Sequence, residues 1–336
     1  MILIISNGHS EPTTDNVIDW LLYYKADFIR LNSEDAVDKT SRLSISIDED
    51  IMTIGGQQIR MDDINVIWYR RWYEYRNVGF RPANAHQRQL LREMFAEAED
   101  LLLYIYYALQ DKLWLCNPLV NKTHNKLYAL RLAHSIGLKI PATFITNHTD
   151  EVIDFLTQQG NIITKPIGDP YVYFEPDGTN YKNFTQKLTI PFLKKLAPDI
   201  FMSLFQELVK ADCEIRTFYL DGDFYSTAIV NSNTIDVKLS VKRDRNLKMI
   251  AYDLPEDIKK KIRLLMKKVG LNTGSIDIIR SKNGEHYFLE VNPVGQFTGY
   301  GFACNYQLEK KIAQWLIRND HKKHLHYEKD QVHQRV

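Results

Sequence analysis

The dipeptide Asn283-Gly284 constrains this chain more than any other feature, because it lies between two apolar segments that alternate like paired strands. Asn-Gly is the strongest short-range signal for a two-residue β-hairpin turn. A turn of known length also fixes the register of the whole hairpin. The register predicted here pairs Lys282 with Glu285, Ile279 with Phe288, Ile278 with Leu289 and Asp277 with Glu290.

Two carboxylates meet in this predicted hairpin, and their neighbours are apolar. Opposed side chains on one sheet face lie about 5 Å apart at Cβ, so Asp277 and Glu290 need a shared proton or a divalent cation between them. Asn292 shares the face of Glu290 and adds a neutral oxygen. Such a trio suits Mg²⁺, whose coordination shell phosphate oxygens and water usually complete. The trio predicts a metal-bound nucleoside triphosphate; the plainer alternative is an exposed strand end with incidental acids.

Length, charge and cysteine content limit the classes of protein that fit. A chain of 336 residues is too long for one simple core, so we expect two or three domains. The net charge of +1 indicates neither a nucleic-acid partner nor an anionic membrane partner. Cys116, Cys213 and Cys304 have no metal or redox spacing and are typical of free thiols in a reducing cytoplasm.

The N-terminal part alternates between strand and helix patterns, as an α/β unit does. Strands are expected over residues 2–6 and 66–69, and a long amphipathic helix over 84–111. The second strand delivers Arg70 and Arg71 to a strand end, where ligands tend to bind in α/β sheets. A structural ion pair explains these two arginines equally well.

The rest of the chain forms two further sections. In the first, we expect a helix over 122–136 and a strand over 162–164 that delivers Lys165. The loop over 166–182 that follows has the composition of a lid. In the second section, Asp221-Gly222 predicts another hairpin turn.

At these positions the chain resembles the ATP-grasp superfamily of carboxylate ligases. Asp277 with Glu290-x-Asn292 matches the metal signature of that superfamily. The segments FLEVNPVGQF, YRRW and NKLYALRLAHSIGLKIPATFIT resemble its peptide-modifying branch, which makes the ester- and amide-crosslinked graspetides. The chain is most similar to the microviridin-like and grasp-with-spasm peptide maturases, and the resemblance covers essentially its whole length.

The resemblance implies an α/β (α+β) chain with the ATP-grasp fold. Its implied parts are an N-terminal pre-ATP-grasp α/β domain (1–118), a central lid subdomain (119–205), a C-terminal antiparallel-sheet subdomain with the metal site (206–320) and a tail (321–336). A final helix is expected over 308–317, ahead of the tail.

The resemblance also implies which residues bind the nucleotide and the metal. Lys126 and Lys165 contact the phosphates of ATP, for which lysine supplies a flexible point charge. The metal ligands are Asp277, Glu290 and Asn292. The remaining nucleotide-binding residues are Gln206, Glu207, Leu208 and Val209, which hold adenine through their main chain, and Glu214, which holds ribose.

Three basic residues are implied to stabilise the transferring phosphoryl group, where fixed donors neutralise developing charge. They are Arg216, Arg243 and Lys238. Lys238 departs from the family pattern, because relatives place an arginine there, so Arg216 and Arg243 rank above it. The lid also departs, because its only glycines are Gly168 and Gly178, and its phosphate contacts stay open.

The implied activity is an ATP- and Mg²⁺-dependent ligation, with two metal ions and with Mn²⁺ as a substitute. An Asp or Glu carboxylate of a ribosomal precursor peptide becomes an acyl phosphate, and a Ser or Thr hydroxyl or a Lys amine of the same peptide then attacks it. The implied partner is a precursor peptide with a leader and an acidic, hydroxyl-rich core. The resemblance also implies a homodimer, and the three free cysteines indicate the cytoplasm.

Two other functions stay open at this point. The first is an ATP-grasp ligase for small metabolites or amino acids, of the glutathione-synthase or glutamate-ligase type, which differs only in the acceptor. The second is an ATP-binding peptide-recognition protein without catalysis. The complete set Lys126, Lys165, Asp277, Glu290 and Asn292 argues against the second, because a protein without catalysis has no need of every metal ligand.

Overall fold

The computed structural model describes residues 1–8, 11–36, 42–72, 84–168, 172–174, 180–182, 185–231 and 247–333. The chain divides into two compact units. Unit 1 consists of Met1–Lys122 and Gln307–Val336, and unit 2 consists of Thr123–Tyr306. The finer division that the sequence implies, at 118/119 and 205/206, stays a prediction.

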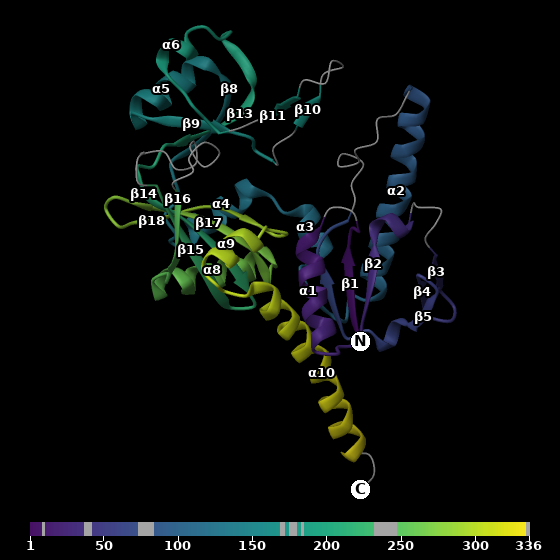
Figure 1. The fold of residues 1–336 in the computed structure, drawn as a ribbon. Coiled ribbons are helices and arrows are strands. Elements are labelled where there is room, and N and C mark those ends of the chain that lie inside the picture. Colours follow the sequence, from purple (N-terminus) through teal and green to yellow (C-terminus); the bar gives the residue numbers. More distant parts are fainter. Residues whose placement is uncertain are drawn as a thin grey trace. The chain divides into compact units, whose positions relative to one another are not determined.

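Unit 1 is built on a parallel sheet with the strand order β2-β1-β6-β7 (Figure 1). Its strands are β1 (Ile2–Ser6), β2 (Phe28–Asn32), β6 (Val66–Tyr69) and β7 (Leu113–Leu115). Every residue of β1 is buried, as is typical of a parallel strand covered on both faces. The two strands predicted for this part are confirmed.

Three helices accompany this sheet, namely α1 (Pro12–Tyr23), α2 (Ala85–Ala108) and α10 (Leu308–His333). Helix α10 packs on α1 and β6. It continues past residue 317, so the predicted end of the last helix is wrong. No glycine or proline interrupts the chain between Leu308 and His333, and the helix has no sequence signal to stop earlier.

Unit 1 also contains a small antiparallel sheet. It consists of β3 (Leu43–Ser46), β4 (Ile51–Ile54) and β5 (Gln57–Arg60), next to the short 3-10 helices η1 (Ser33–Ala36) and η2 (Met61–Asp63).

The first sheet of unit 2 is antiparallel, with the order β12-β9-β13-β8. Its strands are β8 (Thr143–His148), β9 (Ile162–Lys165), β12 (Gln186–Lys187) and β13 (Asp199–Glu207). Two helices, α5 (Thr149–Gln159) and α6 (Ile190–Leu193), pack against it. Their shared core consists of Val152, Leu156, Ile162, Leu188, Leu193 and Phe205. Within the segment predicted as a lid, β10 (Val172–Phe174) pairs with β11 (Asn180–Lys182).

Two helices replace the single helix predicted over 122–136. They are α3 (Pro118–Thr123) and α4 (Lys126–Ser135). The chain leaves the helical conformation at Asn125, whose side chain accepts a hydrogen bond from the N–H of Tyr128 at 2.9 Å. Asn125 is thus an N-cap that begins a new helix. Lys126 is consequently the first residue of α4.

The second sheet of unit 2 is antiparallel, with the order β16-β15-β14-β17-β18 (Figure 1). Its strands are β14 (Ala211–Leu220), β15 (Asp223–Asn231), β16 (Leu247–Tyr252), β17 (Thr273–Ser281) and β18 (His286–Asn292). Helices α8 (Glu256–Val269) and α9 (Thr298–Ala303) complete the unit, with α4 beside β18 and α9 beside β15. The predicted Asp221-Gly222 turn is confirmed, because Leu220 pairs directly with Asp223.

The hairpin at Asn283-Gly284 differs from the prediction. The N–H of Ser281 donates to the carbonyl of Glu285 at 2.8 Å, so the loop contains three residues rather than two. Gly284 adopts the positive φ of 82° that ends such a loop. The predicted pairing of Lys282 with Glu285 is therefore wrong, because a Gly at this position satisfies either loop length.

The longer loop shifts the strand register by one residue, and a bulge further along β18 cancels this shift. Ile279 faces Tyr287 and Ile278 faces Phe288, so the predicted partners Phe288 and Leu289 are wrong by one residue. A β-bulge at Leu289 then inserts one unpaired residue into β18. Beyond the bulge, Asp277 faces Glu290, as predicted.

The bulge determines which way the end of β18 points. Without it, the register of the loop would place Glu290 opposite Ile276, on the face where Ile276 and Ile278 are almost completely buried. A shift of one residue moves each side chain to the other face. The bulge therefore turns Glu290 and Asn292 onto the polar face with Asp277.

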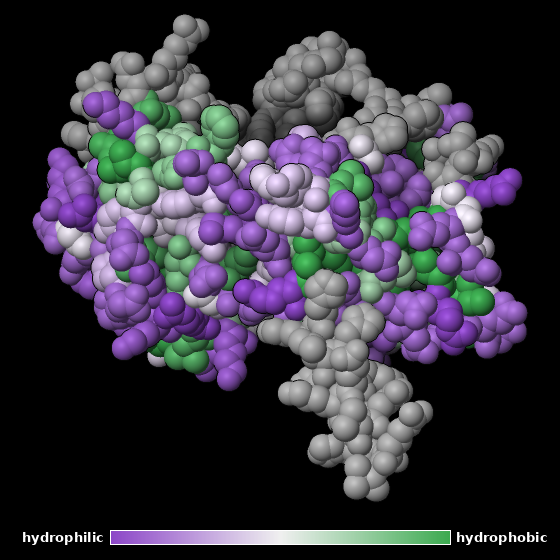
Figure 2. Space-filling view, turned by 60° about the horizontal axis from the view of Figure 1, so that its bottom comes forward, coloured by the Kyte–Doolittle hydropathy of each residue, from purple (hydrophilic) through white to green (hydrophobic). Residues whose placement is uncertain are grey.

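Figure 2 shows hydrophobic residues in several separate groups between hydrophilic ones on the face that it presents. Within the described part of the chain, no helix is both long and apolar enough to cross a membrane.

Candidate functional site

A row of polar side chains crosses four strands of the second sheet in unit 2. In strand order, the row consists of Thr227 of β15, Arg216 of β14, Asp277 of β17 and Glu290 of β18. Directly paired residues lie on the same face of a sheet. The meeting of Asp277 and Glu290 predicted from the sequence is thus confirmed, and Asn292 follows two residues later on their face.

The Arg216 guanidinium links two buried carboxylates. Its Nη2 lies 2.5 Å from Glu214 Oε1, and its Nη1 forms an ion pair with Asp277 Oδ1. Both acids are 1% exposed. Burial on its own would lower the pKa of Arg216, but the charges of Asp277 and Glu214 raise it above the ordinary value. Arg216 therefore stays charged and compensates acids that would otherwise be costly to bury.

Lys126 supplies the second cation of this cluster. Its Nζ lies 3.7 Å from Glu290 Oε2, where the start of α4 meets β18. Among the described residues, the cluster then holds three carboxylates against two cations, which is an excess of one negative charge. A divalent cation would offset that excess, and carboxylate and carboxamide oxygens are hard ligands suited to Mg²⁺. The residues present fit such an ion.

The backbone after Asn292 is fixed by a close approach of two chain segments. The N–H of Gly295 donates to the carbonyl of Asn292 at 3.1 Å, and Ser275 Oγ donates to the carbonyl of Gln296 at 3.0 Å. A Cβ at position 295 would lie 2.1 Å from Ser275 Oγ. Only glycine fits there, and the resulting tight turn holds the end of β18.

The predicted adenine-binding segment leaves the first sheet of unit 2 at the end of β13. The N–H groups of Glu207 and Leu208 donate to the carbonyls of Ala142 and Asn161, at 2.8 and 2.9 Å. Val209 is 6% exposed, and its N–H has no hydrogen-bond acceptor among the described residues. A buried N–H normally finds a partner, so this one fits the acceptor of a base edge.

Of the other residues predicted at the nucleotide site, the structure describes Lys165 and Gln206. Lys165 ends β9 opposite Leu204, and Gln206 is 1% exposed and donates through Nε2 to Thr143 Oγ1 at 3.0 Å. Their contacts with nucleotide stay predictions. Arg243 and Lys238 lie outside the described residues.

Arg70 and Arg71 lie in unit 1, at the end of β6. Arg70 is 3% exposed, and its Nε and Nη2 donate to Glu11 Oε1 at 3.2 and 3.1 Å. Burial lowers the pKa of Arg70, against the charge of Glu11. The side chain of Arg71 is 40% exposed and forms an ion pair with Glu11 Oε2. The structural ion pair allowed by the sequence is therefore present at Arg70.

Two residues of these clusters were missed in the sequence. Glu11 stands immediately before Pro12, which opens α1, so an acid between the first strand and a helix start was a usable signal. Tyr300 lies in α9 with its ring centroid 5.8 Å from Arg216 Cζ. No spacing in the sequence points to Tyr300.

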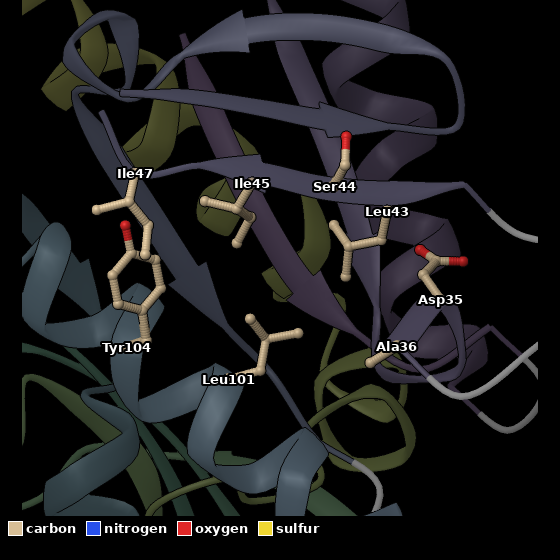
Figure 3. A pocket seen from close by; sticks show the side chains of 8 residues that line it. All are labelled: Asp35, Ala36, Leu43, Ser44, Ile45, Ile47, Leu101 and Tyr104. Atoms are coloured by element: carbon tan, nitrogen blue, oxygen red, sulfur yellow. The ribbon is translucent and has the colours of Figure 1, made fainter. Parts of the chain in front are cut away.

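A cavity of about 390 Å³ in unit 1 has a different character (Figure 3). Leu43 and Ile45 of β3 point toward Leu101 of α2, while Ser44 points away, and Tyr104 lies beside Ile47. Of the described residues that line it, most are apolar, Asp35 is acidic, and none is a lysine or arginine that could bind phosphate.

Neither the family models nor the sequences of curated proteins give a match to this chain. Solved structures do. The macrocyclase MdnC of Microcystis aeruginosa MRC, bound with the precursor peptide MdnA, has a TM-score of 0.77 and 22% identity, over 94% of this chain and 99% of that chain. The ATP-grasp ligase PsnB, complexed with a phosphomimetic variant of a minimal precursor, Mg and ADP, has a TM-score of 0.74 and 18% identity, over 95% and 98%.

A third similar structure is the RiPP-associated ATP-grasp ligase of Chryseobacterium gregarium, in complex with ADP and with a leader and core peptide. Its TM-score is 0.79 and its identity 25%, over 94% of this chain and 96% of that chain. These likenesses span nearly the full length of each chain. The protein therefore has the ATP-grasp fold, as the sequence predicted.

Proposed function

We propose that this protein is an ATP-dependent ligase that crosslinks side chains of a ribosomal precursor peptide. The observation that carries the proposal is the placement of Asp277, Glu290 and Asn292 on one face by the bulge at Leu289. The bulge turns Glu290 and Asn292 onto the face of Asp277. Because β-bulges are designed features that often lie next to active sites, this arrangement argues against an incidental strand end.

The nucleotide is ATP, and several groups of unit 2 suit its parts. Val209 and the preceding Gln206, Glu207 and Leu208 offer the main chain that reads adenine. Glu214 Oε2, which accepts no hydrogen bond from any described residue, is the atom that would receive a ribose hydroxyl. Lys126 and Lys165 would contact phosphate oxygens.

Asp277, Glu290 and Asn292 would hold Mg²⁺, as two ions, and Mn²⁺ would substitute. Bound there, the metal supplies charge neutralisation for the transferring phosphoryl group. Arg216 stays charged between its two carboxylates and is placed to stabilise the same group. Arg243 and Lys238 are proposed to add charge from the basic segment.

The chemistry has two steps. A peptide carboxylate attacks the γ-phosphorus of ATP, the bond to the β-phosphate oxygen breaks, and an acyl phosphate and ADP result. A Ser or Thr hydroxyl or a Lys amine then attacks the acyl carbon, loses its proton, and displaces phosphate to leave an ester or an amide. Water must be kept from the acyl phosphate until this attack occurs.

The peptide substrate is supported by the similar proteins. MdnC, PsnB and the Chryseobacterium ligase are described as bound to precursor, leader or core peptides. This favours a peptide over a free amino acid or small metabolite. The leader, the acidic and hydroxyl-rich core, the homodimer and the cytoplasmic location belong to the same proposal.

Mass spectrometry tests the proposal. The protein is incubated with ATP, Mg²⁺ and the short precursor peptide encoded beside its gene, and the expected product has lost one water mass per crosslink. Condensation of free amino acids with no change in the peptide would support the small-molecule alternative. Absence of any phosphate release in the presence of peptide would contradict an enzyme of this kind.

A further inference from the structure

The carboxyl ends of the strands in unit 1 meet at a topological switch point. The chain passes from β1 through α1 to β2 on one side, and β6 lies on the other side of β1. In open parallel sheets, ligands bind in the crevice outside the strand ends at this point. Here Asn7 directly follows β1, and Arg70 and Arg71 directly follow β6. The N–H of Arg70 donates to the carbonyl of Ile5 at 2.8 Å.

A buried, charged cluster lies at these strand ends. Glu11 is 5% exposed and accepts hydrogen bonds from Arg70 and Thr13, so Arg70 is held in one place. A buried arginine with this pairing acts as a support rather than as a ligand contact. Nearby, Asn7 is 8% exposed, and its Oδ1 accepts no hydrogen bond from any described residue.

Arg71 is the reachable cation of this group. Its side chain is 40% exposed, and its charged partner among the described residues is Glu11, which Arg70 already shares. Two guanidinium groups thus face a single carboxylate. On the β2 side of the crevice the charges are balanced differently, because Arg30 pairs with Asp15 and Glu34 accepts from the N–H of Gly8. Among the described residues, the positive excess on the β6 side therefore lies at Arg71.

We propose that this crevice binds an acidic side chain of the peptide substrate, with its carboxylate on Arg71. A guanidinium presents a planar pair of donors that matches a carboxylate. Glu11 and Arg70 are positioning residues that hold Arg71 at the strand end, and Asn7 Oδ1 is an acceptor for a peptide N–H. This inference rests on the proposed function and names a second place where the acidic peptide is recognised.

The test is a pairwise comparison of enzyme and peptide variants. Arg71→Gln is compared with wild type on the precursor peptide and on peptides in which each Asp or Glu is changed in turn to Asn or Gln. With wild type, one such change should raise the KM for peptide about tenfold, the loss of one charge-assisted pair. Arg71→Gln should show that rise already with the unmodified peptide, and no further rise with that one variant, while kcat at saturating peptide stays the same.

The matched control is Arg60→Gln, which removes another exposed arginine of unit 1, paired only loosely with Asp62 at 4.0 Å. It should behave as wild type. Fluorescence anisotropy of the labelled peptide without ATP gives the same comparison independently of chemistry. Equal peptide affinity for wild type and Arg71→Gln, or enzyme and peptide changes that add rather than overlap, would overturn the subsite even if crosslinking proceeds. Arg71→Lys, which keeps the charge but loses the planar fork, should fall between the two.

Discussion

The two arginine clusters of this protein both combine basic residues with carboxylates, but the excess charge has opposite sign in the two clusters. In unit 2, Arg216 and Lys126 lie among three carboxylates, Glu214, Asp277 and Glu290. In unit 1, Arg70 and Arg71 share one carboxylate, that of Glu11. Arg70 is buried, whereas the side chain of Arg216 is 24% exposed, and both arginines form ion pairs within their clusters.

The sign of the excess charge determines which kind of ligand each cluster attracts. A negative excess on a sheet face attracts a cation, whereas a positive excess at a strand end attracts an anion. Buried ion pairs contribute little net stability, so their main effect is to hold the remaining charged groups in place. These opposite excesses support the proposals that unit 2 binds metal and nucleotide and that unit 1 binds a substrate carboxylate.

The largest effect is expected from Glu290→Gln, which would remove the negative excess of unit 2. We expect kcat to fall about 1,000-fold, as when a group that stabilises a transition state is lost, with an unchanged melting temperature. Steady-state phosphate release measures it. Glu256→Gln, an exposed acid on α8 whose side chain is 67% exposed, is the control and should keep full activity. Full activity in Glu290→Gln would show that the negative excess in unit 2 is not needed for metal binding.

Glu11→Gln tests the other cluster. It would remove the carboxylate that the buried Arg70 and the partly exposed Arg71 share. The free energy of unfolding should fall by about 3–5 kcal/mol, because removing one partner of a buried ion pair leaves an uncompensated charge. Urea denaturation monitored by tryptophan fluorescence measures the free energy of unfolding. The control is Asp62→Asn, whose side chain is 72% exposed and which should change stability by less than about 0.5 kcal/mol. Equal effects of the two changes would mean that Glu11 does not support the arginines.

Gly295→Ala tests the backbone that places Asn292. A Cβ at 2.1 Å from Ser275 Oγ forces the two segments apart, and overpacking of this kind costs about 1–3 kcal/mol. Thermal denaturation with and without Mg²⁺ and nucleotide measures it, and ligand should stabilise the variant less than wild type. Gly299→Ala, where nothing lies within 4 Å, is the control. An equal response of both variants to ligand would show that this turn does not shape the site.

Lys165→Ala should have the smallest effect. Loss of one charge-assisted phosphate contact raises the KM for ATP about tenfold, with kcat nearly unchanged. Lys187→Ala, an exposed lysine on the neighbouring strand β12, is the control. Identical ATP kinetics in Lys165→Ala and wild type would remove Lys165 from the nucleotide site.

The pairing of Asp277 with Glu290 could be predicted from the sequence, but the loop length and the pairs between the loop and Asp277 could not. Asp221-Gly222 forms the two-residue turn that its sequence indicates, whereas Asn283-Gly284 lies in a three-residue loop. Both loops need a residue of positive φ at the glycine, so local sequence does not decide between them. The bulge at Leu289 restores the predicted pairing of Asp277 with Glu290 despite the wrong loop length. Nothing in the sequence distinguishes a bulged leucine from a paired one.

The ion pairs were beyond sequence reasoning for a different reason. Arg216 was predicted to face the phosphoryl group, yet its contact with Asp277 depends on the pairing of β14 with β17, which lie 53 or more residues apart. Glu214, by contrast, lies two residues from Arg216 on the same strand. Glu11 and Arg70 resemble the first case, because only the parallel pairing of β1 with β6 brings them together. Long-range strand pairing is not encoded in periodicity.

Asp277 and Glu290 are proposed to hold a divalent ion together with a nucleotide. Electron paramagnetic resonance of Mn²⁺, titrated with protein in the presence of a non-hydrolysable ATP analogue, tests it directly. Wild type and Arg71→Gln should reduce the signal of free Mn²⁺ to the same extent, whereas Asp277→Asn and Glu290→Gln should leave most of it. Equal Mn²⁺ binding by all four proteins would contradict the account.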